Sequence, residues 1–274
     1  MGKNKLHMVT KTKSKKSKRR SKKKRTKRMK LNVVDVPLSS SVSLGSKASK
    51  GDINYHYQKY YNTFAFLKEI VKGNKQLQKR VCVPDIGEGW MKAFLKVNFV
   101  KDKLDSVMPV DTEFTKEQFI KEIEVCMKER LIPINLEIIV PGAGTHANII
   151  IIDSKKKTVE LFEPHGSRKD SSELESIYGA YAKVSKKVER FFKQYLPAYR
   201  YIRPSEYEPK RGLQYRLDDF SGLCITWSIL YLHYRLLNPD IDPKKLVSYL
   251  DKKFTKKTLL RYTRYVEEVL KHNV

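Results

Sequence analysis

Residues 146–162 read HANIIIIDSKKKTVELF, and this stretch decides the fold of the chain. His146 to Ile152 contains four consecutive isoleucines, Asp153 to Lys157 is polar, and Thr158 to Phe162 is apolar again. Two apolar runs on either side of a polar turn predict two buried antiparallel strands. Asn135 to Val140 is also apolar and rich in isoleucine, so it predicts a neighbouring strand. The core of the chain should therefore contain a β-sheet.

Helical patterns lie before and after this hairpin. Apolar residues recur with a 3.6-residue period from Thr115 to Leu131, and Thr115 with Gln118 is placed as a capping box. The same period from Ser171 to Tyr195 predicts a long amphipathic helix. A Tyr-rich helical stretch precedes them at residues 55–71. Residues 81–110 are predicted to be irregular, with Trp90 and Phe94 as anchors.

The segment from Gly222 to Leu237 is apolar almost all round, which predicts a helix at the centre of the fold. Ser221 is its predicted N-cap, and Asn238-Pro239 ends it. Asp242-Pro243 begins one or two C-terminal helices, and residues 199–202 form a further strand. This order predicts an α+β fold, in which a central buried helix packs on a small mixed β-sheet with flanking helices.

The positive charge of the chain is concentrated at its N-terminus. The 274 residues include 57 Lys or Arg and 30 Asp or Glu, and residues 1–30 hold 16 of the basic residues and no acidic one. Such a block repels itself and cannot form a core. We expect residues 1–30 to be a disordered basic arm, residues 31–52 a linker and residues 53–274 the globular domain.

Phosphate binding is the first function expected of the basic arm. The arm has no aromatic residue and, apart from Asn4, no Asn or Gln among its basic residues, so binding to nucleic acid should be independent of sequence. Nuclear import is the alternative that the same residues fit, and a merely solvated charge run is the third. The residues expected to contact nucleic acid are Lys15, Lys16, Lys18, Arg19, Arg20, Lys22, Lys23, Lys24, Arg25, Lys27 and Arg28.

Cysteine usage and hydropathy indicate the compartment. Cys82, Cys126 and Cys224 are an odd number at wide spacing, so all three are expected to be free thiols in a reducing compartment. No stretch approaches 18 consecutive apolar residues, and the basic N-terminus leads into no signal-peptide pattern. We expect neither membrane insertion nor secretion.

Cys224 is the candidate nucleophile, because the predicted central helix would place it in the first turn. A thiol there lies beside unsatisfied backbone N–H groups and the positive end of the helix dipole, which stabilise a thiolate. Position alone also fits a buried core cysteine. His146 and His165 are the histidines left as possible bases, since His233 is nine residues further along the same helix and cannot reach Cys224.

The hairpin register decides between the two histidines. A two-residue turn at Ser154-Lys155 would place His146 directly opposite Glu163, and a longer turn would shift this pairing by one or two residues. An imidazole oriented by a carboxylate, next to a Cys at a helix N-terminus, matches the base and orienting group of a catalytic triad. No Cys or His pair has zinc-ligand spacing and no Gly-rich phosphate loop occurs, so no metal and no cofactor are expected.

These residues resemble a known superfamily, that of the cysteine proteases containing the adenovirus endopeptidase and the proteases that remove SUMO-like modifiers. The resemblance lies in the segments 146–149, 161–166 and 219–228, and it covers roughly residues 133–240. The run from Cys224 to Asp240 is most similar to predicted thiol proteases of large DNA viruses of eukaryotes. The resemblance implies a Cys-His-acid triad of Cys224, His146 and Glu163, and a cysteine-protease-like domain over residues 53–274.

The resemblance leaves the oxyanion hole open. The family has a Gln six or seven residues before the nucleophile, where this chain has Asp218 and Leu217. Gln214, Asp218 and Asp219 are therefore the candidates, and only Gln214 can donate as the family's Gln does. The implied substrate is a protein, either a structural-protein precursor or a conjugate of a ubiquitin-like modifier.

Two functions from different classes follow. The first is a viral-type cysteine endopeptidase or isopeptidase with a nucleic-acid-binding arm, in a virion or in the host nucleus or cytoplasm. The second is a catalytically weak or inactive protease-like protein of the virion that packages nucleic acid. The three triad residues favour the enzyme, whereas the missing Gln and the basic arm favour the structural protein.

Overall fold

A computed structural model describes residues 31–34, 60–83, 94–100, 103–104, 106–110, 114–140, 144–167, 178–217 and 223–271. The chain divides into two units, residues 1–30 and Leu31–Val274, and every described residue belongs to the second. The expected basic arm thus lies outside the described residues. The elements are α1 (Tyr60–Lys72), α2 (Lys75–Gln78), β1 (Phe94–Val100), β2 (Lys103–Leu104), β3 (Met108–Pro109), α3 (Lys116–Cys126), β4 (Leu131–Val140), β5 (Gly144–Asp153), β6 (Thr158–Phe162), α4 (Tyr178–Tyr195), β7 (Arg200–Ile202), α5 (Pro204–Tyr207), α6 (Leu213–Leu217), α7 (Cys224–Leu237), α8 (Pro243–Lys253) and α9 (Lys256–Lys271).

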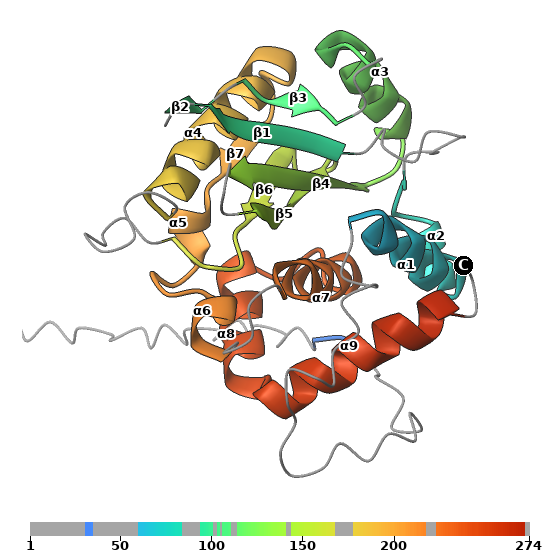
Figure 1. The fold of residues 1–274 in the computed structure, drawn as a ribbon. Coiled ribbons are helices and arrows are strands. Elements are labelled where there is room, and N and C mark those ends of the chain that lie inside the picture. Colours follow the sequence, from blue (N-terminus) through green and yellow to red (C-terminus); the bar gives the residue numbers. More distant parts are fainter. Residues whose placement is uncertain are drawn as a thin grey trace, which may run out of the picture. The chain divides into compact units, whose positions relative to one another are not determined.

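The strands form one mixed sheet in the order β2-β1-β4-β5-β6-β7, with β3 also paired to β1. β1 runs parallel to β4, and β6 runs parallel to β7. Between them, β5 is antiparallel to both β4 and β6. Helices cover both faces of this sheet (Figure 1). The predicted α+β fold is confirmed.

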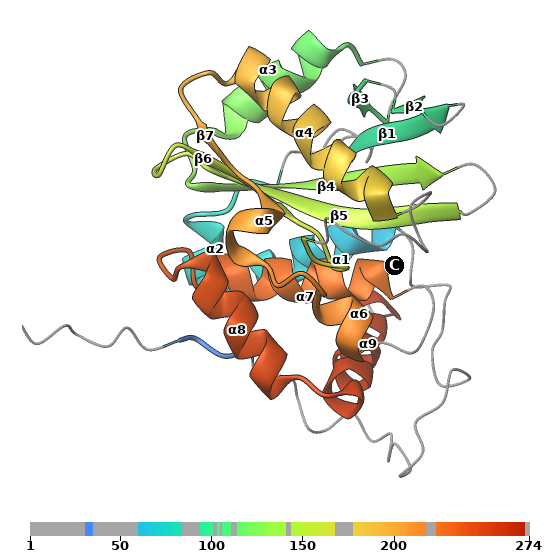
Figure 2. The same ribbon diagram turned by 90° about the vertical axis from the view of Figure 1, so that its left-hand side faces the viewer.

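Side chains of β5 alternate between the two faces of the sheet and contribute to two hydrophobic cores. Ala147, Ile149 and Ile151 belong to the core that the sheet shares with α1, α7, α8 and α9. Ile150 and Ile152 belong to the core shared with α3 and α4. Figure 2 shows α3 and α4 on one side of the sheet and α7 on the other. The isoleucine run is apolar on both faces because both faces are covered.

One face of α7 follows the β5–β6 hairpin along its whole length. Positions 224, 228, 231 and 235 are spaced as i, i+4, i+7 and i+11, so they lie on one side of the helix. The Tyr231 ring stacks on the Phe162 ring at 4.0 Å. Near the end of the helix the buried Arg235 guanidinium bonds both carboxylate oxygens of the buried Glu160, at 3.0–3.1 Å. These contacts fix the position of α7 on the sheet.

The hairpin turn differs from the prediction. It contains four residues, from Ser154 to Lys157, rather than two, and Asp153 pairs with Thr158. The Asp153 carboxylate accepts the backbone N–H of Lys156 at 2.9 Å, and Lys157 adopts a left-handed φ of 53°. An Asp side chain that bonds the backbone stabilises this wider turn. The register of β5 and β6 therefore shifts by two residues.

The cysteine prediction is wrong for two of the three residues. Cys82 and Cys126 form a disulfide, with their Cα atoms 5.4 Å apart, and Cys224 is free. An isolated parallel bridge between Val81 and Leu131 brings the segment that follows α2 beside the start of β4, and α3 ends at Cys126 just before that strand. The pairing depends on a contact between distant segments, which the cysteine spacing does not reveal.

Several helix boundaries agree with the sequence patterns. The Thr115–Gln118 capping box is present on α3, and Asp242 caps α8 with Pro243 at its first position. The prediction that Ser221 caps α7 is wrong, because Leu223 is the N-cap and makes no side-chain capping bond. Residues 81–110, expected to be irregular, contain β1, β2 and β3, with Phe94 buried as expected. Trp90 and residues 171–177 lie outside the described residues.

Candidate catalytic site

Cys224 is the first residue of α7 and so lies in the first turn, as the sequence predicts, where backbone N–H groups are unsatisfied. One turn later on the same helical face, the Ser228 hydroxyl donates to the carbonyl oxygen of Ala147 at 3.2 Å. This bond joins α7 to β5 beside His146. A hydrogen bond between the Cys224 thiol and the His146 ring is among the interactions that raise the pKa of the imidazole. The nucleophile and base candidates are therefore in contact.

The Glu163 carboxylate holds the other side of the imidazole. His146 Nε2 lies 2.6 Å from Glu163 Oε1, and both side chains are buried. The same oxygen accepts the backbone N–H of His165 at 2.9 Å, and Oε2 accepts Asn148 Nδ2 at 2.7 Å. Because Nε2 is engaged, Nδ1 is the nitrogen left to face the thiol. Three donors converge on one buried carboxylate, which favours its ionised form.

The pair forms although the predicted register is wrong. The observed ladder pairs Ile149 with Phe162, and extending it by three residues places His146 opposite His165 rather than Glu163. The two imidazole rings indeed lie 4.6 Å apart, inclined at 34°. Glu163 follows the last residue of β6, and its side chain reaches His146 diagonally, as neighbours two positions apart in a ladder can.

The pKa values of His146 and His165 are shifted in opposite directions. Burial disfavours the imidazolium of His146, but the Glu163 carboxylate and the contact with Cys224 outweigh it and raise the pKa of His146 to about 10. For His165, burial and the nearby His146 lower the pKa to about 4. The pKa of Glu163 is lowered, since burial is outweighed by the charge of His146 and by its donors. At neutral pH the His146 ring is therefore positively charged beside the Glu163 carboxylate.

Replacing Glu163 with Gln should lower the pKa of His146 from about 10 toward the ordinary 6.5, because the amide is neutral. In the wild type the positive ring should persist until the pH rises through about 10. The positive ring contributes fully to folding stability below pH 6.5, and this contribution is lost as the pH rises from 6.5 through about 10. NMR titration of the ring protons measures this. His233, whose buried ring has a pKa of about 4, is the internal control that should not move. An unchanged His146 titration in the variant would contradict the assignment.

Of the oxyanion-hole candidates, Gln214 is among the residues that the structure describes, and it lies beside the segment that follows Glu163. It is buried on α6, and its backbone N–H donates to the carbonyl of Pro164 at 3.0 Å. Among the described residues its Oε1 has no hydrogen-bond partner. Asp218 and Asp219 lie outside the described residues, as do the basic residues of the arm. Asn148 is a site residue that sequence reasoning missed; it stands two positions after His146, on the same face of β5.

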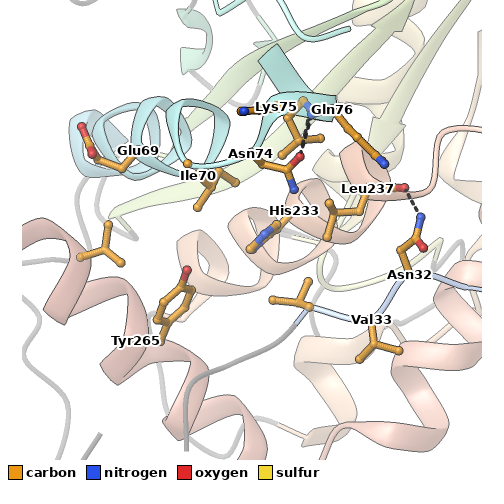
Figure 3. A pocket seen from close by; sticks show the side chains of 14 residues that line it. Asn32, Val33, Glu69, Ile70, Asn74, Lys75, Gln76, His233, Leu237 and Tyr265 are labelled. Carbon is orange, nitrogen blue, oxygen red and sulfur yellow. Dashed lines mark hydrogen bonds between the residues drawn. The ribbon is translucent and has the colours of Figure 1, made fainter. Parts of the chain in front are cut away.

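His233 lies away from this centre, as its position on α7 predicts. It lines a groove of about 790 Å³ between α1, α2, α7, α9 and residues 32–34 (Figure 3). Cys224, His146 and Glu163 are not among the residues that line this groove. Within the described part of the chain, no three His, Cys, Asp or Glu side chains are placed to hold a metal ion. No helix among the described residues is both long and apolar enough to span a bilayer.

Comparison with known proteins gives one related sequence at 32% identity. No protein-family model matches the chain. The chain is 32% identical over 152 residues to the "Putative ankyrin repeat protein L371" of Acanthamoeba polyphaga mimivirus. The match takes in 51% of this chain and 19% of that protein. The chain therefore spans about a fifth of the length of this relative.

Solved structures give only distant similarity. The effector protein ChlaDUB1 of Chlamydia trachomatis matches with a TM-score of 0.37 at 11% identity, covering 77% of this chain and 83% of that one. The effector RavZ of Legionella pneumophila matches with a TM-score of 0.42 at 10% identity, covering 77% and 62%. Chlamydia trachomatis Cdu1, solved bound to ubiquitin, matches with a TM-score of 0.35 at 11% identity, covering 77% and 88%.

Proposed function

We propose that the chain is a cysteine endopeptidase or isopeptidase of the viral type that its motifs resemble. Cys224 is the nucleophile, His146 the general base and Glu163 the group that orients the imidazole. One observation carries the proposal: a Cys at the start of the central helix contacts a buried histidine, which a carboxylate holds at 2.6 Å. Nucleophile, base and orienting group in this order are the requirements of thiol acyl transfer.

The geometry supports the following reaction. The proton of the Cys224 thiol is held by His146, and the thiolate sulfur attacks the carbonyl carbon of a peptide or isopeptide bond. The negative oxygen that develops is bound by the backbone N–H of Cys224 at the start of α7, with Gln214 as the second donor once its amide is turned by 180°. His146 then protonates the departing amine, and a water molecule hydrolyses the thioester under base catalysis by the same ring.

Covalent probes test this function without a known substrate. The full chain would be incubated with ubiquitin and ubiquitin-like modifiers that carry a C-terminal propargylamide, and with a proteome-derived peptide library. We expect an adduct on Cys224 or new peptide termini with the wild type, and neither with Cys224→Ala. Absence of both adduct and cleavage in the wild type would overturn the enzyme and favour the virion structural protein.

The basic arm is proposed to bind nucleic acid through its phosphates. If half of its 16 basic residues neutralise phosphates, the log-log dependence of affinity on salt on duplex DNA should have a slope of roughly −7. Fluorescence anisotropy of a labelled duplex at several salt concentrations measures the slope. The slope should not change when the duplex sequence is scrambled, because phosphates carry no sequence information.

Deleting residues 1–30 provides the control, since Leu31–Val274 form a separate unit. The truncated chain should lose most of the affinity and the salt slope while keeping the melting temperature of the full chain. An unchanged slope would assign the nucleic-acid surface to the folded unit. The arm would then be better explained as an import signal.

A further inference from the structure

Glu208 is a buried carboxyl group that the proposed reaction does not use. It follows α5, and only 8% of its surface is exposed. Its Oε1 accepts the backbone N–H of Glu163 at 2.9 Å, whereas Oε2 is buried with no hydrogen-bond partner among the described residues. An apolar side chain would fill this space without leaving Oε2 unpaired, but it would leave the N–H of Glu163 without an acceptor. The bond to Glu163 therefore explains the carboxyl group.

The contact belongs to a larger junction between residues 163–167 and residues 208–214, which we call the clasp. Three backbone bonds cross it: Ser167 N–H to Pro209 O at 3.0 Å, Gly212 N–H to His165 O at 2.7 Å, and Gln214 N–H to Pro164 O at 3.0 Å. The Ser167 hydroxyl adds a bond to the Glu208 carbonyl at 3.1 Å. The clasp therefore ties the segment that carries Glu163 to the segment that carries Gln214.

Two glycines allow the clasp to close. A Cβ atom on Gly166 would lie 2.3 Å from the backbone nitrogen of Gly212, and a Cβ on Gly212 would lie equally close to the nitrogen of Gly166. Gly166 also has a φ of +93°, which side chains rarely permit. The two backbones are in direct contact, so a shift of one segment must displace the other.

We propose that Glu208 is a positioning residue of the catalytic centre, which holds the backbone of Glu163 and, through the clasp, aligns Gln214 with it. This inference rests on the proposed protease function. Glu208 touches no reacting atom. It fixes the residue that orients His146, and small errors of position in such a group are costly: about 1 Å can reduce the rate roughly 100-fold.

The environment keeps Glu208 neutral, which suits this role. Burial is the largest effect, and together with the Glu163 and Glu160 carboxylates it raises the pKa of Glu208 well above its ordinary value. The hydrogen bond from the backbone N–H of Glu163 opposes the shift, as does, to a smaller extent, one from Tyr207 on α5, but burial outweighs both. A neutral acid accepts the N–H of Glu163 without placing a second negative charge beside the orienting carboxylate. The neutral amide of a Gln at position 208 should therefore accept the same N–H.

The test compares Glu208→Gln with Glu208→Met, which has a similar length but no acceptor. We expect Glu208→Gln to hydrolyse substrate within about threefold of the wild-type rate, and Glu208→Met to lose roughly 10- to 100-fold. NMR titration should show the His146 pKa lowered in Glu208→Met alone, because Glu163 is no longer held against the ring. Glu189 on α4, which is equally buried but paired with Arg203, is the matched control: Glu189→Met should change stability and leave the His146 titration unchanged.

Equal rates and equal His146 titrations in the wild type and Glu208→Met would overturn the inference, as would equal losses in Met and Gln. If Glu208→Met does not fold, Glu208→Asp replaces it: the shorter carboxyl cannot reach the N–H of Glu163, and the same loss and titration shift are expected. The NMR readout needs no substrate. A wild type without thiol reactivity therefore refutes the protease function, while an unmoved His146 titration refutes the role of Glu208.

Discussion

Replacing Cys224 with Ala should abolish hydrolysis, with a loss of at least about 10⁴-fold in kcat, and His146→Ala should be as damaging. Nucleophile and base act as one unit, so removing either leaves only the rate enhancement that binding and the oxyanion hole provide. For the same reason the double variant should be no slower than either single variant. Hydrolysis of the substrate found with the probes measures this, and Glu163→Gln should retain some activity because an amide still orients the ring.

His165 provides the matched control for His146. Its ring centroid lies 4.6 Å from that of His146, so His165→Phe keeps an aromatic ring in place and removes the second imidazole. This variant should remain active within about tenfold of the wild type, since the phenyl ring preserves the packing. Activity in His146→Ala together with inactivity in His165→Phe would show that His165 is the base. The melting temperatures of Cys224→Ala and His165→Phe should stay close to that of the wild type.

Removing the Arg235 guanidinium should destabilise the fold by about 3–5 kcal/mol, because it leaves the Glu160 carboxylate buried without its partner. Both side chains are at most 4% exposed. Arg235 also donates to the carbonyl oxygens of Asn238, Pro239 and Ile241 at 3.0–3.1 Å. Arg235→Met therefore removes the donor of these three oxygens as well. Urea denaturation of Arg235→Met measures the change in the free energy of unfolding.

An exposed arginine on a neighbouring helix controls for the loss of charge alone. Arg261 lies on the exposed side of α9, and Arg261→Met should change the free energy of unfolding by less than about 0.5 kcal/mol. Glu160→Gln should cost less than Arg235→Met, because the amide can still accept from Tyr231 and Arg235. Equal stability of Arg235→Met and the wild type would show that α7 does not need this ion pair.

Local patterns were enough to predict the elements that carry the site. The four isoleucines after His146 predict β5, and the apolar run before Asn238 predicts α7 with Cys224 in its first turn. Each of these signals lies within one element. The alternation of Leu95 and Val97 with Lys96 was a comparable signal for β1, whereas β2 and β3 are two residues long and exist only through pairing with β1.

Contacts between distant segments could not be predicted. Asn148 reaches Glu163 because of a register that the Asp153 side chain sets in the turn. Glu208 reaches the same residue from 45 positions away through the clasp. The Cys82–Cys126 disulfide depends in the same way on a bridge between separate segments. The sequence thus contains the identities of the three residues proposed as the triad, and the tertiary structure determines the groups that position them.

The pH dependence of Cys224 alkylation tests the central claim most directly. Iodoacetamide reacts with thiolates, and Cys224 is the free cysteine of the chain. We predict that the wild type reacts rapidly at pH 6, where an ordinary thiol is almost fully protonated, because the imidazolium of His146 stabilises the thiolate. His146→Ala should react at least about tenfold more slowly at this pH. Equal rates in the two proteins at pH 6 would contradict a Cys224–His146 catalytic pair.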